Sequence, residues 1–209
     1  MRKLKQTFIL LVLVLSITTL FSSCEKLFGY DFTKQEGVDN IKAKIAEHIP
    51  ADALVSKIRF MGDDVNSFST KMVIVTVNYY EPNSSELKQT LIYTTQDNVQ
   101  DRTKYLISFD KKLMPEDAIK LSDIDMSKVA GNIARAVEMI KEEDYPFSGI
   151  EDYVIIPKGN NENTIHEFHI QSRSGSDTKI KGGKTVTETQ YYKIPFVADG
   201  KGNLTISEK

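Results

Sequence analysis

The sequence predicts an α+β protein in which a helix packed on an antiparallel β-meander occurs twice, behind a cleaved N-terminal signal. Two amphipathic helical stripes begin about ninety residues apart. Each stripe is followed by segments rich in β-branched and aromatic residues, and turn-forming residues separate these segments. The 209 residues, of which 40% are hydrophobic, suffice for one domain or two small ones with a real core.

The first unit is predicted at residues 36–110. Its helical stripe consists of Val38, Ile41, Ile45 and Ile49, at spacings of three and four, and ends before Pro50. Strands are expected at residues 54–61, 71–80, 86–95 and 104–110. In the second of these strands, period-two alternation places Val75 and Val77 toward the core and Met72 toward the opposite face.

The second unit is predicted at residues 127–209, after a linker at 111–126 that Pro115 and several acidic residues mark as a loop or short helix. Its helical stripe consists of Val129, Ile133, Val137 and Ile140, with Ser127 as the expected N-cap. Strands are expected at residues 150–157, 164–173, 185–196 and 203–207. Residues 179–184, which include Gly182 and Gly183, are expected to lie within a longer loop.

This element order, a helix followed by a meander and present twice, is similar in outline to the β-lactamase-inhibitor-protein-like and PepSY-like folds. The resemblance covers most of the chain after the signal and depends on element order, with no sequence motif behind it. It implies that helices cover one face of a twisted sheet and that the other face stays open. No functional residue is transferred from it.

Residues 1–23 have the pattern of a secretory signal peptide. Arg2, Lys3 and Lys5 form a basic start, and the run at 7–20 contains no charged residue. A helix that spans a membrane permanently is the alternative, and it needs about 20 predominantly apolar residues. The strongly apolar part at residues 8–15 is much shorter, which favours a signal that is removed.

The end of this signal, LFSSC at residues 20–24, resembles the lipobox of bacterial lipoproteins. Ser22 and Ser23 match its small positions, whereas Phe21 is bulkier than the usual residue. The resemblance implies diacylglyceryl transfer to the thiol of Cys24, cleavage before Cys24 and acylation of the new amino group. Ordinary cleavage that leaves a free thiol is the alternative. Because Cys24 is the one cysteine of the chain, its coincidence with this position favours lipidation.

The expected partner of the N-terminus is therefore a lipid bilayer, bound through acylated Cys24, with residues 24–35 as a tether. Removal of residues 1–23 takes away three of the 27 basic residues and none of the 29 acidic ones, which leaves a net charge of −5. An acidic body is not attracted to an anionic bilayer, so the lipid provides the attachment. Glu25 is compatible with the outer membrane of a bacterium and does not decide the leaflet. Nucleic acid is not an expected partner, because the chain has no basic excess.

No constellation of residues predicts a metal site, a cofactor or a catalytic centre. His166 and His169 are three residues apart in a predicted strand, so they lie on opposite faces and cannot chelate one ion together. Residues 199–203 lack the ligand spacing of a calcium loop and are interpreted as a hairpin turn. Neither a Gly-x-Ser-x-Gly elbow nor a phosphate-binding glycine loop occurs.

The open face of the sheet is the predicted location of any binding. Tyrosine and arginine are enriched where proteins dock, and outward positions of two strands combine them with threonine and mixed charge. The candidate binding residues are Glu167, His169, Gln171, Arg173, Thr187, Tyr191 and Lys193. A solvated face with high β-propensity is the alternative for each of them.

Three classes of function remain open at this stage. The preferred one is a membrane-anchored envelope protein that binds or assembles with a protein or peptide through the open sheet face, without enzymatic activity. A carrier of a lipid or another small apolar ligand is the alternative, and it requires an apolar cavity. An envelope hydrolase is the second alternative, and it requires a cleft in which several titratable groups converge.

Overall fold

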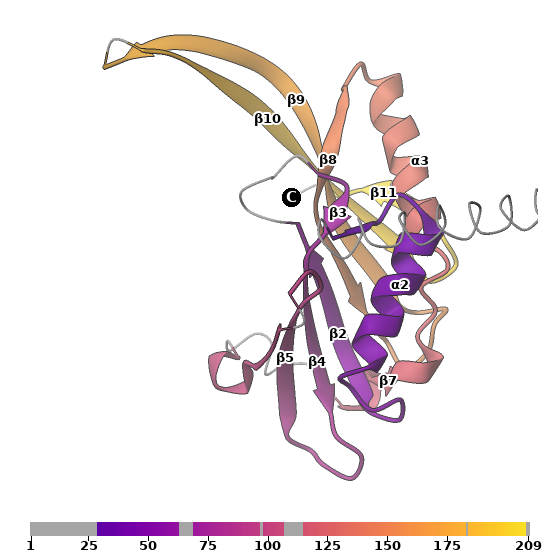
Figure 1. Cartoon of the computed structure of the whole chain (residues 1–209). Helices are drawn as coiled ribbons and strands as arrows, with labels where there is room; N and C mark the ends of the chain where they lie inside the picture. The colour runs from indigo at the N-terminus through magenta and orange to yellow at the C-terminus, as the bar shows by residue number, and fades with distance from the viewer. Residues whose placement is uncertain (1–28, 63–68, 97, 107–114, 183, 208–209) are drawn as a thin grey trace, which may run out of the picture.

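The computed structural model describes residues 29–62, 69–96, 98–106, 115–182 and 184–207 (Figure 1). The predicted signal peptide and Cys24 lie outside these residues. The described helices are α2 (Gln35–Ala46) and α3 (Val129–Glu142). The strands are β1 (Tyr30–Asp31), β2 (Leu54–Met61), β3 (Lys71–Met72), β4 (Ile74–Tyr80), β5 (Leu87–Tyr93), β6 (Asn98–Asp101), β7 (Ile119–Lys120), β8 (Phe147–Ile156), β9 (Ile165–Lys181), β10 (Lys184–Asp199) and β11 (Leu204–Ile206).

A single nine-stranded antiparallel sheet contains both meanders. Its order is β11-β10-β9-β8-β2-β4-β5-β6, and β7 pairs additionally with β2. Each helix precedes one meander, and the first strands of the two meanders, β2 and β8, pair with each other. The predicted α+β class, with a helix and an antiparallel meander occurring twice, is confirmed. The two meanders form one continuous surface.

Both helices lie on the same side of the sheet, and the core lies between them and that face (Figure 1). The apolar stripe of α2 is buried through Val38, Ile41 and Ile45, and that of α3 through Val129, Ile133 and Ile140. From the sheet, the largest fully buried side chains are Phe60, Tyr153, Phe168 and Phe196. The opposite face of the sheet carries neither of the described α-helices.

Two β-bulges decide which residues of β2 and β8 face the core. In β2, the extra residue Ser56 allows Val55 and Ile58 to share the core side although they are three positions apart. In β8, the extra residue Glu151 does the same for Ile150 and Tyr153. As a consequence, Asp152 is directed to the open face.

Four local expectations are wrong. Met72 is fully buried, because the predicted strand at 71–80 breaks at Val73 and the short strand β3 pairs with β1.

Helix α3 begins at Val129, and Ser127 does not cap it. The backbone N–H of Ser127 instead donates to the carboxylate of Asp125. The fourth strand of the first meander is β6, since residues 103–105 form a 3-10 turn. Residues 107–110 of the predicted strand lie outside the described part of the chain.

The fourth correction concerns residues 179–184, which are not a longer loop. Strand β9 continues to Lys181 and β10 starts at Lys184, and these two residues pair with each other. Gly183 lies outside the described residues. Gly182 has φ of 58°, a left-handed conformation that a two-residue hairpin turn of this kind requires. The two strands therefore continue far beyond the rest of the sheet.

Candidate functional site

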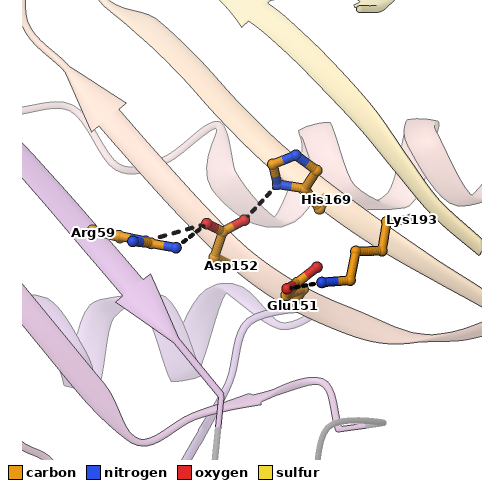
Figure 2. A network of polar contacts seen from close by, with 5 residues as sticks. All are labelled: Arg59, Glu151, Asp152, His169 and Lys193. Carbon is orange, nitrogen blue, oxygen red and sulfur yellow. Dashed lines mark hydrogen bonds and ion pairs between the residues drawn. The ribbon is translucent and has the colours of Figure 1, made fainter. Parts of the chain in front are cut away.

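An ion network on the open face joins three neighbouring strands, β2, β8 and β9 (Figure 2). Nη2 of Arg59 lies 2.8 Å and Nε lies 3.2 Å from Oδ2 of Asp152. Nδ1 of His169 lies 2.7 Å from Oδ1 of the same carboxylate. Each oxygen of Asp152 therefore has its own cationic or hydrogen-bonding partner.

The strand register places this network. Asp152 is directly opposite His169 in the pairing of β8 with β9. Arg59 is opposite Val154, two positions along β8, and its long side chain spans the diagonal to Asp152. Because all three residues are on paired strands of one sheet, the backbone holds their spacing rigidly.

The carboxylate is buried and its partners reach the solvent. The side chain of Asp152 is 8% exposed, whereas those of Arg59 and His169 are 47% and 30% exposed. Burial by itself raises the pKa of Asp152, but the hydrogen bond from His169 and the charges of His169 and Arg59 outweigh it, so its pKa lies below the usual value. The network thus presents a guanidinium and an imidazole on a fixed, ionised anchor.

A second ion pair extends the network toward β10. Lys193 donates to Oε1 of Glu151, the bulge residue of β8 (Figure 2). The side chains of Lys193 and Glu151 are 60% and 34% exposed. An exposed pair of this kind contributes little to stability. It does add a positive and a negative charge at defined positions beside the Arg59–Asp152–His169 network.

The structure brings together only part of the predicted binding set. His169 and Lys193 belong to the ion network, Glu167 and Arg173 are exposed nearby on β9, and Tyr191 is half-buried. Thr187 is exposed farther out, where β9 and β10 extend beyond the sheet.

Gln171 was expected to be accessible and is instead buried, with 4% exposure. It lies on an interior strand, between Gly149 of β8 and Lys193 of β10. Its Oε1 has no hydrogen-bond partner among the described residues. Period-two alternation gives the face of a residue but not how far its neighbours cover it, which is why exposure was predicted wrongly.

Sequence reasoning missed Arg59, Glu151 and Asp152. A polar signal was present, because Glu151 and Asp152 interrupt an otherwise apolar strand. Without the bulge, however, Ile150 and Asp152 would share a face, and the pattern would not place Asp152 beside His169. Only the register of the folded sheet reveals the network.

The two histidines of β9 lie on opposite faces, as predicted. His166 is 2% exposed and faces the helices, whereas His169 belongs to the open face. Among the described residues, no group of three or more His, Cys, Asp or Glu side chains is placed to hold a metal ion. Within the same part of the chain, none of the helices combines the length and apolar character needed to cross a membrane.

Comparisons with known proteins add little to this geometry. No protein-family model matches the chain, and no curated protein matches it either. Among solved structures, it is similar to a candidate lipoprotein from Clostridium difficile 630, with 16% sequence identity and a TM-score of 0.33. That match covers 78% of this chain and 95% of the other. A likeness of this size carries no argument about function.

Proposed function

We propose that this protein is a lipid-anchored envelope protein that binds a protein or peptide partner through the open face of its sheet, without enzymatic activity. The observation that supports it most is the ion network on that face. Helices α2 and α3 leave this face uncovered, and Asp152 holds Arg59 and His169 in fixed positions there.

The anchor in this proposal is acylated Cys24. The basic start, the apolar run and the small residues before Cys24 support lipidation, and Glu25 is compatible with the outer membrane. A single acyl chain anchors only marginally, whereas three chains on one residue hold a protein at the bilayer permanently. The expected tether at residues 24–35 is shorter in the structure, because Tyr30–Asp31 forms β1, Phe32 is fully buried and α2 begins at Gln35. The residues between Cys24 and β1 connect the anchor to the sheet in this proposal.

Preorganisation is what makes the network suited to recognition. Binding usually costs the ordering of flexible side chains at the interface. Arg59 and His169 are already oriented by the buried carboxylate of Asp152, so less of this cost remains when a partner docks. The mixed charges of Glu151, Asp152 and Lys193 require a partner of complementary pattern, which favours specificity over bulk attraction.

Site-specific photo-crosslinking tests the proposal. A photoreactive residue at Glu167, exposed on the open face, is compared with one at Glu138, exposed on α3, in the full chain produced in its native host. We expect a crosslinked product of one discrete mass from position 167 and none from position 138. Products of equal yield from both positions, or none from 167, would overturn the proposal.

The hydrolase alternative has one observation in its favour. In His169 and Asp152, Nδ1 of an imidazole lies 2.7 Å from a carboxylate, as in the base-orienting half of a catalytic triad. A nucleophile beside His169 would complete it. An active-site fluorophosphonate probe distinguishes the two functions: labelling of the wild type that disappears in the His169→Ala variant would indicate a hydrolase, and the binding proposal predicts no labelling.

A further inference from the structure

Gln171 of β9 belongs to the open face, is 4% exposed, and has no hydrogen-bond partner for its acceptor atom Oε1 among the described residues. A buried acceptor without a partner destabilises a fold, because it has lost water and no donor replaces it. Such an atom in a folded protein calls for an explanation, and a donor that arrives with a ligand is one.

The strand register defines the surroundings of Gln171. Its partner on β8 is Gly149, which contributes no side chain to this face, and its partner on β10 is Lys193. Along β9, the neighbours on the same face are His169 and Arg173, because the alternation is uninterrupted there. The side chains of Arg173 and Lys193 are both exposed.

The ion pair between Lys193 and Glu151 crosses β9 beside Gln171. Lys193 belongs to β10 and Glu151 to β8, and these two strands flank β9. Nζ of Lys193 lies 2.5 Å from Oε1 of Glu151, so the lysine side chain passes over β9 on the open face (Figure 2). Glu151 precedes Asp152, which is opposite His169, whereas Lys193 is opposite Gln171. The crossing therefore lies between His169 and Gln171.

This ion pair is a cover that opens easily. The side chains of Lys193 and Glu151 are 60% and 34% exposed. An exposed pair contributes little to stability, so its opening costs little. A donor that binds Oε1 of Gln171 removes a larger penalty, that of a buried acceptor without a partner. The balance of the two effects favours exchange of the cover for a bound donor.

The neighbouring charges decide which donor fits. A cationic donor would be repelled by Lys193 and Arg173, and a carboxylate has no proton to donate. An amide is neutral, and it combines an N–H with a carbonyl oxygen. Its N–H can bind Oε1 of Gln171, while its carbonyl oxygen accepts a hydrogen bond from the Nζ of Lys193 that the opened pair releases.

We propose that Gln171 is the recognition acceptor of the open face. The Lys193–Glu151 pair covers it in the free protein, and a peptide partner displaces this cover and donates an amide N–H to Oε1 of Gln171. The amide belongs to the backbone or to an Asn or Gln side chain of the partner. This inference rests on the proposed function, because it names the group by which the partner is recognised on that face.

Two conservative substitutions on β9 separate recognition from stability. Gln171→Met keeps the length of the side chain and removes its polar atoms. Ser172→Ala is the matched control, because the hydroxyl of Ser172 is also buried without a partner but lies on the face that the helices cover. Neither substitution should lower the free energy of unfolding in chemical denaturation, since each removes an unsatisfied buried group.

Recognition is measured with the photoreactive residue at position 167, in the full chain produced in its native host. We expect Gln171→Met to lower the yield of the crosslinked product about tenfold, through loss of one hydrogen bond to the partner. Ser172→Ala should leave the yield unchanged.

The outcomes distinguish this inference from the proposed function. A wild-type chain that gives no product at position 167 overturns both. A discrete product with equal yields from the wild type and Gln171→Met overturns the recognition role of Gln171 alone, and binding through the open face stands. A Gln171→Met variant that loses stability together with the product shows that Gln171 supports the fold, which also overturns the inference.

Thiol labelling tests the cover without any partner. The purified full chain carrying Gln171→Cys is labelled with methyl methanethiosulfonate, and the wild type reports any labelling through Cys24. Adding Glu151→Gln breaks the ion pair and should raise the labelling rate of the cysteine at position 171 about fivefold. Equal rates with and without Glu151→Gln would show that the pair does not cover this position and would overturn the proposal.

Discussion

The hydroxyl of Tyr153 lies 3.0 Å from Nδ1 of His166 in the interior, between α3 and the sheet. The same hydroxyl accepts a hydrogen bond from Nδ2 of Asn132, at 3.0 Å, and its own proton can be donated to Nδ1 of a neutral His166. Arg135 donates to Oδ1 of Asn132 and links the chain of bonds to the surface of α3.

This arrangement predicts that His166 makes the fold sensitive to acid. Burial lowers the pKa of His166 from 6.5 to about 4, and the charge of Lys128 acts in the same direction, against Asp125 and Asp199. Below pH 6.5 the unfolded chain binds a proton that the native state does not. The free energy of unfolding should therefore fall by about 3 kcal/mol between pH 7 and pH 4 through this group.

Chemical denaturation of the wild type and His166→Asn between pH 7 and pH 4 measures this effect. The asparagine cannot titrate, and its amide oxygen is able to accept the bond from Tyr153. All other residues are the same in the two proteins, so their contributions cancel in the comparison. The stability advantage of the wild type should shrink as the pH falls. An advantage that is independent of pH would contradict the assignment.

The variant Tyr153→Phe removes a bridging hydroxyl and leaves Asn132 and His166 without their shared partner. Because both are buried, we expect a loss of about 1–3 kcal/mol in the free energy of unfolding. Tyr192→Phe is the matched control, since Tyr192 is 55% exposed and should change stability little. Equal effects from the two variants would show that the buried hydroxyl stabilises nothing.

The variant Asp152→Asn tests the ion network on the open face. The pKa of Asp152 is lowered in the native state, so its contribution is fully present above its unfolded value of 3.8 and is lost as the pH falls through the native pKa. We expect the variant to be less stable by about 1 kcal/mol or more near pH 6. Once the pH lies below the native pKa of Asp152, the difference should vanish because both side chains are then neutral. A difference that persists there would point to packing instead of charge.

Two helical glycines predict opposite effects of the same substitution. A Cβ at Gly37 of α2 would lie 2.1 Å from the backbone oxygen of Asp31, so Gly37→Ala forces the β1 segment to move. At Gly131 of α3, nothing lies within 4 Å of the added atom. Gly131→Ala should therefore raise the free energy of unfolding by about 0.5–1 kcal/mol, while Gly37→Ala lowers it. Thermal denaturation of both variants checks the signs.

The periodicity of apolar residues predicted those helices and strands that can be recognised from their own segment of the sequence. The stripes of Val38–Ile49 and Val129–Ile140 gave α2 and α3, and β-branched runs gave strands such as β2. The bulges at Ser56 and Glu151 could not be predicted from the alternation of apolar and polar residues, because a bulge is defined by the register with the partner strand. The network around Asp152 could not be predicted for the same reason.

The long hairpin of β9 and β10 shows a second limit. Residues 179–184 were predicted to lie in a longer loop, because polar and threonine-rich flanks are compatible with a loop as well as with an exposed ribbon. Pairing across the turn decides between them, and it is a property of two segments together. Thr187 was correctly placed on the same face as Tyr191 and Lys193 because β10 contains no bulge.

The claim that this protein works at a membrane surface is tested most directly by its intact mass after purification from membranes of its native host. The account predicts a chain that starts at Cys24 and carries the mass of added acyl chains, and a Cys24→Ala variant that is absent from the membrane fraction. A wild-type protein without added mass, released with the soluble envelope contents, would contradict the lipid anchor.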